Sequence, residues 1–109
     1  ACRPDAPAMT YEIAPEWVAL HRGEVHVLDV RSAAEFDGAL GHLEGAQLLP
    51  LDELRARVSE VPSDKPVVVV CETGRRSGLA TIILRNAGVE RVANVAGGML
   101  QWREIGLSS

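Results

Sequence analysis

The residues best suited to chemistry lie together in one short loop near the middle of the chain. Cys71 ends an apolar run, PVVVVC, and the next six residues open directly into a predicted helix. These six residues are Glu72, Thr73, Gly74, Arg75, Arg76 and Ser77. A thiol at a helix N-terminus faces unpaired backbone N–H groups and the positive end of the helix dipole, which favour the thiolate. We therefore predict that Cys71 is a nucleophile with a lowered pKa.

The loop around Cys71 also has the composition of an anion cradle. Successive N–H groups in a short loop can hold a persulfide or the oxygens of an oxyanion, and Gly74 lets the backbone bend inward. Arg75 and Arg76 add fixed positive charge. The alternative is a buried structural cysteine, which is a frequent fate of cysteine at a strand end.

Two apolar, β-branched runs at residues 25–30 and 66–71 predict neighbouring central strands that are buried on both faces. After the second run, apolar residues recur at helical spacing up to Ala87, and Gly88 follows where a left-handed C-terminal residue would sit. The sequence thus predicts a strand, loop and helix unit over residues 67–88, with Cys71 at its turn.

The remaining elements are predicted to be shorter. We expect strands at residues 46–49 and 91–95, and helices at 15–21, 51–58 and 99–105. Strands that alternate with helices indicate an α/β protein with a mostly parallel sheet and helices on both faces. Ligands in such folds bind beyond the carboxyl ends of the strands, which is where Cys71 lies.

Length and charge limit the classes of function. The 109 residues suit one domain, which we place at residues 11–109 after a flexible, proline-rich segment at 1–10. A net charge of −4 argues against nucleic-acid or anionic-membrane partners, and no apolar stretch approaches the length of a membrane span. We therefore expect a soluble, cytoplasmic protein. A disulfide between Cys2 and Cys71 is not favoured.

Several separated motifs, in the same order, resemble those of the rhodanese family. The strand, six-residue loop and helix around Cys71 are similar to that family's active-site loop. The stretches LDVR with EF, then GHLEGA, resemble its two N-terminal signatures, and GGMLQW resembles its C-terminal one. The resemblance covers residues 11–106, which is nearly the whole chain.

The resemblance implies a three-layer α/β fold with a mostly parallel five-stranded sheet. It also implies a sulfurtransferase in which Cys71 takes sulfane sulfur from thiosulfate or a persulfide and passes it to a thiol or another nucleophile such as cyanide. Loop N–H groups would stabilise the bound sulfur, Arg76 would hold anionic groups, and Arg75 and Ser77 would assist at the rim. No metal or organic cofactor is required, and the partners are a small-molecule sulfur donor and a thiol or protein acceptor.

The cysteine loop differs from two patterns known in the family, and two other functions remain as alternatives. Glu72 stands where thiosulfate-using members commonly have a basic residue, and the mercaptopyruvate-using pattern lacks an arginine pair. The fold could instead serve as a non-catalytic binding or regulatory module. A related phosphatase or arsenate reductase is a further alternative, but five residues separate cysteine and arginine there, whereas four separate Cys71 and Arg76.

Residues elsewhere could support the loop. In the family pattern Asp29 would lie near the loop and orient it by hydrogen bonds. We favour a salt bridge for Arg31, and a capping box for Ser32 and Glu35, because Ser-x-x-Glu satisfies free N–H groups at a helix start. For His42 we favour a loop-fixing hydrogen bond over a titrating role near the pocket.

The other histidines and the tryptophans are assigned structural roles. His21 and His26 have no second ligand at metal spacing, so no zinc site is expected. Trp17 and Trp102 lie on the apolar faces of predicted helices and are expected to fill the core.

Overall fold

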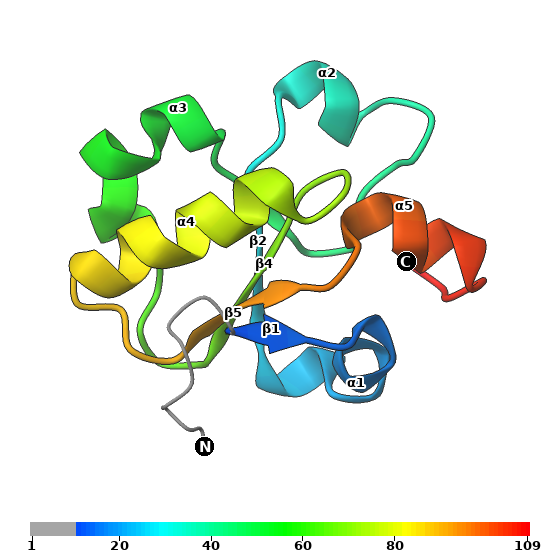
Figure 1. The fold of residues 1–109 in the computed structure, drawn as a ribbon, viewed down its shortest axis with the longest axis horizontal. Coiled ribbons are helices and arrows are strands. Elements are labelled where there is room, and N and C mark those ends of the chain that lie inside the picture. Colours follow the sequence, from blue (N-terminus) through cyan, green and yellow to red (C-terminus); the bar gives the residue numbers. More distant parts are fainter. Residues whose placement is uncertain (1–10) are drawn as a thin grey trace.

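Five parallel strands form one sheet in the computed structural model, which describes residues 11–109 (Figure 1). The strand order is β1-β5-β4-β2-β3, and every neighbouring pair is parallel. The strands are β1 (Glu12–Ile13), β2 (His26–Asp29), β3 (Gln47–Leu48), β4 (Val67–Val70) and β5 (Val92–Val95). The predicted flexible segment and Cys2 lie outside the described residues.

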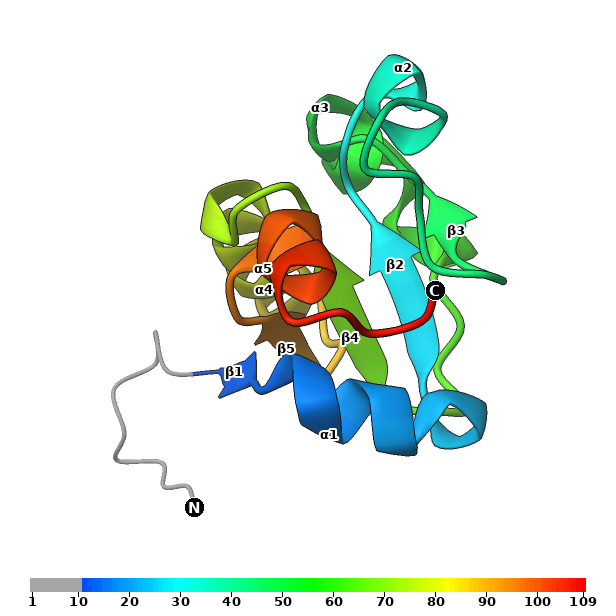
Figure 2. The ribbon, with the colours of Figure 1, turned by 90° about the vertical axis from the view of Figure 1, so that its right-hand side faces the viewer.

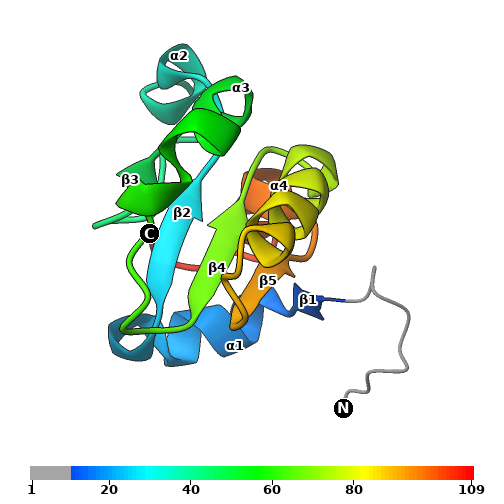
Figure 3. The ribbon, with the colours of Figure 1, turned by 90° about the vertical axis from the view of Figure 1, so that its left-hand side faces the viewer.

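Helices cover both faces of this sheet, which gives the three layers expected (Figures 2 and 3). The helices are α1 (Pro15–Leu20), α2 (Ala33–Phe36), α3 (Leu51–Leu54), α4 (Arg75–Asn86) and α5 (Gly98–Glu104), with 3-10 turns η2 (Arg22–Glu24) and η3 (Arg55–Glu60). One apolar cluster joins the sheet to α3 and α4, and the other joins it to α1 and α5.

The central strand β4 contributes to both clusters because successive side chains of a strand point to opposite faces. Val67, Val69 and Cys71 belong to the cluster under α3 and α4, whereas Val68 and Val70 belong to the cluster under α1 and α5. All four valines of β4 are buried. This explains the unbroken apolar run in the sequence and confirms the prediction of a strand covered on both faces.

Most predicted elements agree with the structure to within a residue or two. Helix α4 ends as predicted, because Gly88 takes a left-handed φ of +99° just beyond it. The helix predicted at residues 51–58 is wrong in its second half, since α3 stops at Leu54 and the chain continues as 3-10 turns. There Arg57 leaves helical geometry, with φ −120°, and its guanidinium pairs with Glu53 and Glu60.

The topology opens a crevice beyond β2 and β4. These strands are neighbours, but β2 leads to β3 on one side of the pair while β4 leads to β5 on the other. The loops that leave them therefore diverge, as at the ligand-binding switch points of open α/β sheets. Cys71 begins one of these loops and Val30 begins the other, which places the cysteine at the crevice.

The N-terminus of α5 fixes the backbone of the loop that follows β4. The N–H of Met99 donates to the carbonyl oxygen of Cys71 at 2.7 Å, and the N–H of Leu100 donates to that of Glu72 at 2.9 Å. Gly98 makes this approach possible, because a Cβ there would lie 2.4 Å from the Cys71 oxygen and 2.5 Å from the Glu72 oxygen. Its φ of +62° also favours glycine.

No helix within residues 11–109 has the length and apolar character needed to cross a membrane.

We expect Gly98→Ala to lower the free energy of unfolding by at least about 2 kcal/mol, because the new methyl group meets two carbonyl oxygens at a left-handed position. Urea denaturation measures the change. Gly23→Ala is the control, since a Cβ at Gly23 meets nothing within 4 Å and should change stability by no more than about 0.5 kcal/mol. Equal stabilities for the two variants would contradict the proposed close contact.

Candidate active site

The sulfur of Cys71 lies at the centre of its loop, where backbone N–H groups converge on it. The N–H of Gly74 donates to Sγ at 3.0 Å, and the N–H of Ser77 donates to it at 3.3 Å. Gly74 precedes α4 with a φ of +101°, so the inward bend expected at this glycine is present. Ser77 lies in the first turn of α4, whose N–H groups have no partner within the helix. The loop is therefore built around the sulfur.

These contacts favour the thiolate. Burial raises the pKa of the Cys71 thiol, but hydrogen bonds from the Ser77 hydroxyl and from the N–H groups of Ser77, Gly74 and Thr73 outweigh it. The net result is a pKa below the ordinary value for cysteine. The side chain is only 1% exposed, so the sulfur sits at the bottom of the loop rather than on the surface.

A buried polar chain continues from the sulfur to β5. The Cys71 thiol donates to the Ser77 Oγ at 3.4 Å, and that hydroxyl donates to the Oδ1 of Asn94 at 2.7 Å. The Nδ2 of Asn94 in turn donates to Glu12 at 3.5 Å. A hydroxyl has one proton, so Ser77 must turn from Asn94 to Sγ when it stabilises the thiolate. Asn94 was missed by the sequence analysis, although a polar residue inside the apolar strand VANV was a usable signal.

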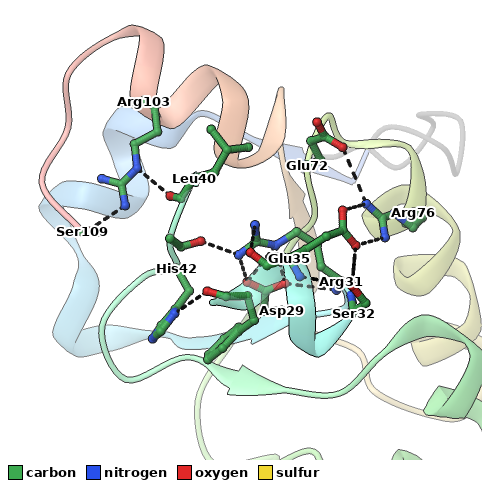
Figure 4. Close-up of polar contacts among 12 residues, drawn as sticks. Asp29, Arg31, Ser32, Glu35, Leu40, His42, Glu72, Arg76, Arg103 and Ser109 are labelled. Atoms are coloured by element: carbon green, nitrogen blue, oxygen red, sulfur yellow. Dashed lines mark hydrogen bonds and ion pairs between the residues drawn. The ribbon is translucent and has the colours of Figure 1, made fainter. Parts of the chain in front are cut away.

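The guanidinium of Arg76 lies beside the loop and is paired with Glu35 (Figure 4). Both terminal nitrogens of Arg76 donate to the Glu35 carboxylate, each at 2.7 Å. The Oε1 of Glu72 approaches the same guanidinium at 4.0 Å. Sequence analysis assigned Arg76 to anionic donor or acceptor groups. In the structure its donors are directed instead to a carboxylate of the chain itself.

Glu35 is held in place by its own helix start. The Ser32 hydroxyl accepts from the Glu35 N–H at 3.2 Å, and the Glu35 Oε1 accepts from the Ser32 N–H at 3.0 Å. This confirms the predicted capping box. The hydrogen bonds from Arg76 lower the pKa of Glu35 to about 2, although burial opposes them. Glu35 thus caps α2 and pairs with the active-site loop at once, and the sequence analysis found only the first role.

Asp29 and Arg31 form a buried ion pair at the end of β2. The Asp29 carboxylate accepts from the Arg31 Nε at 2.9 Å and from one terminal nitrogen at 2.8 Å, and both side chains are almost fully buried. The salt bridge favoured for Arg31 is therefore confirmed. Asp29 was expected to orient the cysteine loop by hydrogen bonds. Within residues 11–109, the hydrogen bonds that its carboxylate accepts come from Arg31 instead, because that residue, two positions on, fills the carboxylate's acceptor sites.

The Arg31 guanidinium links this pair to the segment that carries Glu35. It donates to the carbonyl oxygens of Glu35 at 3.2 Å and Gly41 at 2.7 Å. Asp29 therefore reaches the cysteine loop only indirectly, through Arg31, Glu35 and Arg76.

The sequence and the fold were compared with those of known proteins. A family model described as a rhodanese-like domain matches residues 15–105. The chain belongs to the rhodanese-like domain family. A rhodanese-related protein from Thermoplasma volcanium has the same fold, with a TM-score of 0.82 and 28% identity over 89% of this chain and 94% of that one.

Two bacterial relatives of this rhodanese-like domain differ in length. A protein of Allochromatium vinosum named sulfurtransferase is 38% identical over 84 residues, which are 77% of this chain and 77% of that protein. The Bacillus subtilis protein YqhL is 39% identical over 79 residues, which are 72% of this chain and 61% of YqhL. The chain thus spans less than two thirds of YqhL.

The other loop residues of the rhodanese-like domain face solvent. Glu72, Thr73 and Arg75 are exposed, while Ser77 is buried. The side chain of Arg75 is thus open to solvent. Ser77 was expected to assist at the rim, but its side chain is fully buried and its N–H donates to the sulfur. The side chain of Glu72 is half exposed, and its Oε1 lies 4.0 Å from the guanidinium of Arg76 (Figure 4).

The histidines of the rhodanese-like domain have structural partners. His42 contacts the carbonyl oxygen of Phe36 through Nδ1 at 2.8 Å and stacks on the Phe36 ring, which confirms the loop-fixing hydrogen bond. The Nε2 of His26 contacts Gln47. Within residues 11–109, no three His, Cys, Asp or Glu side chains are grouped closely enough to hold a metal ion.

The two tryptophans differ. Trp102 is fully buried, as predicted. The prediction for Trp17 is wrong, because its side chain is 38% exposed and stacks on His21. The buried face of α1 is formed by Pro15 and Val18, and Trp17 is rotated away from it.

We expect Ser77→Ala to raise the pKa of Cys71, because the hydroxyl and its hydrogen bond to the sulfur are lost. The thiolate absorbance of Cys71 can be titrated in a Cys2→Ser background, which leaves one thiol. Ser63→Ala, a change outside the loop, is the control and should leave the titration in place. A Ser77→Ala curve that superimposes on the parent would contradict this account of the thiolate.

We expect Glu35→Gln to flatten the acid dependence of stability. The Glu35 carboxyl titrates near 4.5 when unfolded and near 2 in the fold, so its ion pair stabilises the protein above pH 4.5. That stabilisation is lost as the pH falls from about 4.5 to about 2. Urea denaturation across this range measures the slope, with the exposed Glu24→Gln as a control. A Glu35→Gln curve parallel to the wild type would contradict the coupling.

Proposed function

We propose that this domain is a sulfurtransferase that carries sulfane sulfur as a persulfide on Cys71. The observation that supports this most is the convergence of N–H groups on a buried cysteine sulfur whose pKa is lowered. Such a site stabilises negative charge on sulfur, which is what a thiolate and a persulfide anion share. The family match and the relative named sulfurtransferase agree with this chemistry.

The first step loads the cysteine. The Cys71 thiolate attacks the outer sulfur of the donor, a new S–S bond forms, and the donor's own bond to that sulfur breaks. With thiosulfate the leaving group is sulfite, and with an alkyl persulfide it is a thiolate. The leaving group takes the electron pair of the broken bond, so no external oxidant or reductant is needed.

The second step returns the cysteine to its thiolate. An acceptor nucleophile, a thiolate or cyanide, attacks the outer sulfur of the persulfide, and the Cys71 sulfur leaves with the bonding pair. The convergent N–H groups of Gly74 and Ser77 that bind the resting thiolate also stabilise it as this leaving group. The same contacts therefore serve both steps, and neither step calls for a metal or an organic cofactor.

The buried environment of Cys71 does not by itself distinguish this proposal from a purely structural cysteine. A structural cysteine in an apolar core has no need of two backbone donors, a hydroxyl and a neighbouring Asn94. Each of these polar groups is buried and needs a hydrogen-bond partner, and here that partner is the sulfur or a group bonded to it. Their concentration around one sulfur favours catalysis over a binding module that keeps only the fold.

Incubation with a sulfane sulfur donor should add one sulfur atom, about 32 Da, to the intact protein. Because the persulfide forms on Cys71, the adduct should be absent from Cys71→Ser and retained by Cys2→Ser. Intact mass spectrometry with and without a reductant measures it, since reduction removes a persulfide. An adduct that survives in Cys71→Ser but not in Cys2→Ser would overturn the assignment.

A further inference from the structure

The charge of Arg76 is already engaged before any substrate arrives. Glu35 binds both terminal nitrogens of its guanidinium, and Glu72 lies 4.0 Å from one of them (Figure 4). A bidentate pair of carboxylate and guanidinium is among the strongest and most directional contacts that arginine makes. An anionic donor that uses Arg76 must therefore displace a carboxylate of the protein.

Glu35 is also well placed to keep this position. Its carboxylate accepts from the Ser32 N–H at 3.0 Å, and its carbonyl oxygen accepts from Arg31 at 3.2 Å. Glu35 is thus fixed at both its backbone and its side chain, so its ion pair with Arg76 costs little additional conformational entropy. The pKa of about 2 keeps the carboxylate charged throughout the neutral range.

A pocket of about 410 Å³ adjoins the paired arginine. Its lining has an apolar part and a polar part. The apolar part is Val30, Pro50, Leu51, Leu79 and Ile83, and the polar part is Ser32, Asp52, Arg55 and Arg76. The side chain of Leu79 is 47% exposed, so this lining is accessible from solvent. The apolar part of this lining gains free energy from contact with an organic group, which a small inorganic donor does not have.

We propose that Glu35 determines donor specificity: by occupying Arg76 it withholds the guanidinium from dianionic donors and biases the site toward alkyl persulfides. This inference rests on the proposed sulfur transfer to Cys71. The alkyl group would lie in the pocket beside Arg76, which follows Cys71 in the same loop.

The two donors differ in the charge that the site must accept. Thiosulfate brings two negative charges, and the thiolate displaces sulfite, which leaves with both charges and the electron pair. A neutral alkyl persulfide, RSSH, transfers its outer sulfur to the thiolate as Cys71–SSH and leaves as RS⁻. Glu35 acts on the first reaction by electrostatics and has little effect on the second.

The experiment compares the rates at which two donors load Cys71. Thiosulfate and the persulfide of 2-mercaptoethanol are mixed with the protein, and the mass of the intact chain is followed in a quenched time course. We expect Glu35→Gln to raise the loading rate with thiosulfate on the order of tenfold at low ionic strength, with less gain at high salt. The rate with the alkyl persulfide should change less than about twofold.

Glu35→Gln suits this test because a glutamine can keep the capping box while it removes the charge. Glu24 lies in η2, just before the start of β2, whereas the cysteine loop follows the end of β4. Glu24→Gln therefore removes the same charge at the opposite end of the strands and should leave the ratio of the two rates unchanged. Glu35→Gln combined with Arg76→Gln should cancel the gain, because the released guanidinium is then absent. A merely structural role for Glu35 would alter both donors alike and would not depend on salt.

A second variant covers the case in which Glu35→Gln does not fold, which thermal unfolding would reveal. Glu72→Gln leaves α2 untouched and should shift the ratio toward thiosulfate in the same direction, by about twofold to threefold.

The outcomes separate this inference from the proposed function. If Cys71 is loaded but the ratio of the two loading rates is unchanged in folded Glu35→Gln, the role of the carboxylates is overturned and sulfur transfer stands. Where only Glu72→Gln folds, an unchanged ratio in that variant has the same meaning. Absence of any sulfur on Cys71 from either donor overturns the proposed function itself.

Discussion

Two hydrogen bonds from the start of α5 hold the carbonyl oxygens of Cys71 and Glu72, and the geometry of the whole loop depends on them. The carbonyl of a residue and the N–H of the next residue belong to one peptide unit and point in opposite directions. Binding the Glu72 carbonyl to α5 therefore turns the N–H of Thr73 toward the sulfur, where it lowers the pKa of Cys71 together with the N–H groups of Gly74 and Ser77. Gly98 allows the approach because it has no side chain.

The second organising feature joins the two strands at the crevice. Asp29 at the end of β2 holds Arg31, Arg31 holds the segment of Glu35, and Glu35 holds Arg76 at the start of α4. The chain of contacts thus connects neighbouring strands through their loops rather than through the sheet. It fixes the position of one arginine relative to the sulfur, and it places the carboxylate of Glu35 beside that arginine.

Local features of the sequence predicted the fold and the position of Cys71. The valine run, Gly74, the helical spacing after it and the Ser32 capping box all act within a few residues of one another, so a reader of the sequence can recognise them. The end of α3 was predicted less well, because Arg57 leaves helical geometry and the chain continues as 3-10 turns although its apolar spacing is still helical. Trp17 was misplaced because one residue on a helix, a rotation of about 100°, separates the buried Val18 from the exposed Trp17.

The contacts that were not predicted join residues far apart in sequence. Glu35 and Arg76 are 41 positions apart, and each already had a sufficient local role, so nothing in the pattern of either indicated the other. Asp29 lies close to the cysteine loop as expected, since Asp29 pairs with Val70 in the register of β2 and β4. The role was wrong because Arg31, two residues away, binds the Asp29 carboxylate in place of the cysteine loop. Asn94 shows that a polar residue within an apolar strand points to a buried partner even when that partner cannot be named.

The near-complete burial of the Cys71 sulfur has a consequence for which molecules can react with it. Under the proposed chemistry, loading adds a second sulfur, and an S–S bond moves the reactive atom outward by about 2 Å. The resting sulfur is recessed, so a large thiol or a protein disulfide meets the walls of the loop before it meets Sγ. Under the same chemistry, the outer sulfur of the loaded form would lie up to about 2 Å closer to the surface than Sγ. A bulky acceptor can therefore react with the outer sulfur of the persulfide but not with the buried Sγ. The depth of the cysteine in the loop thus protects it from forming a mixed disulfide.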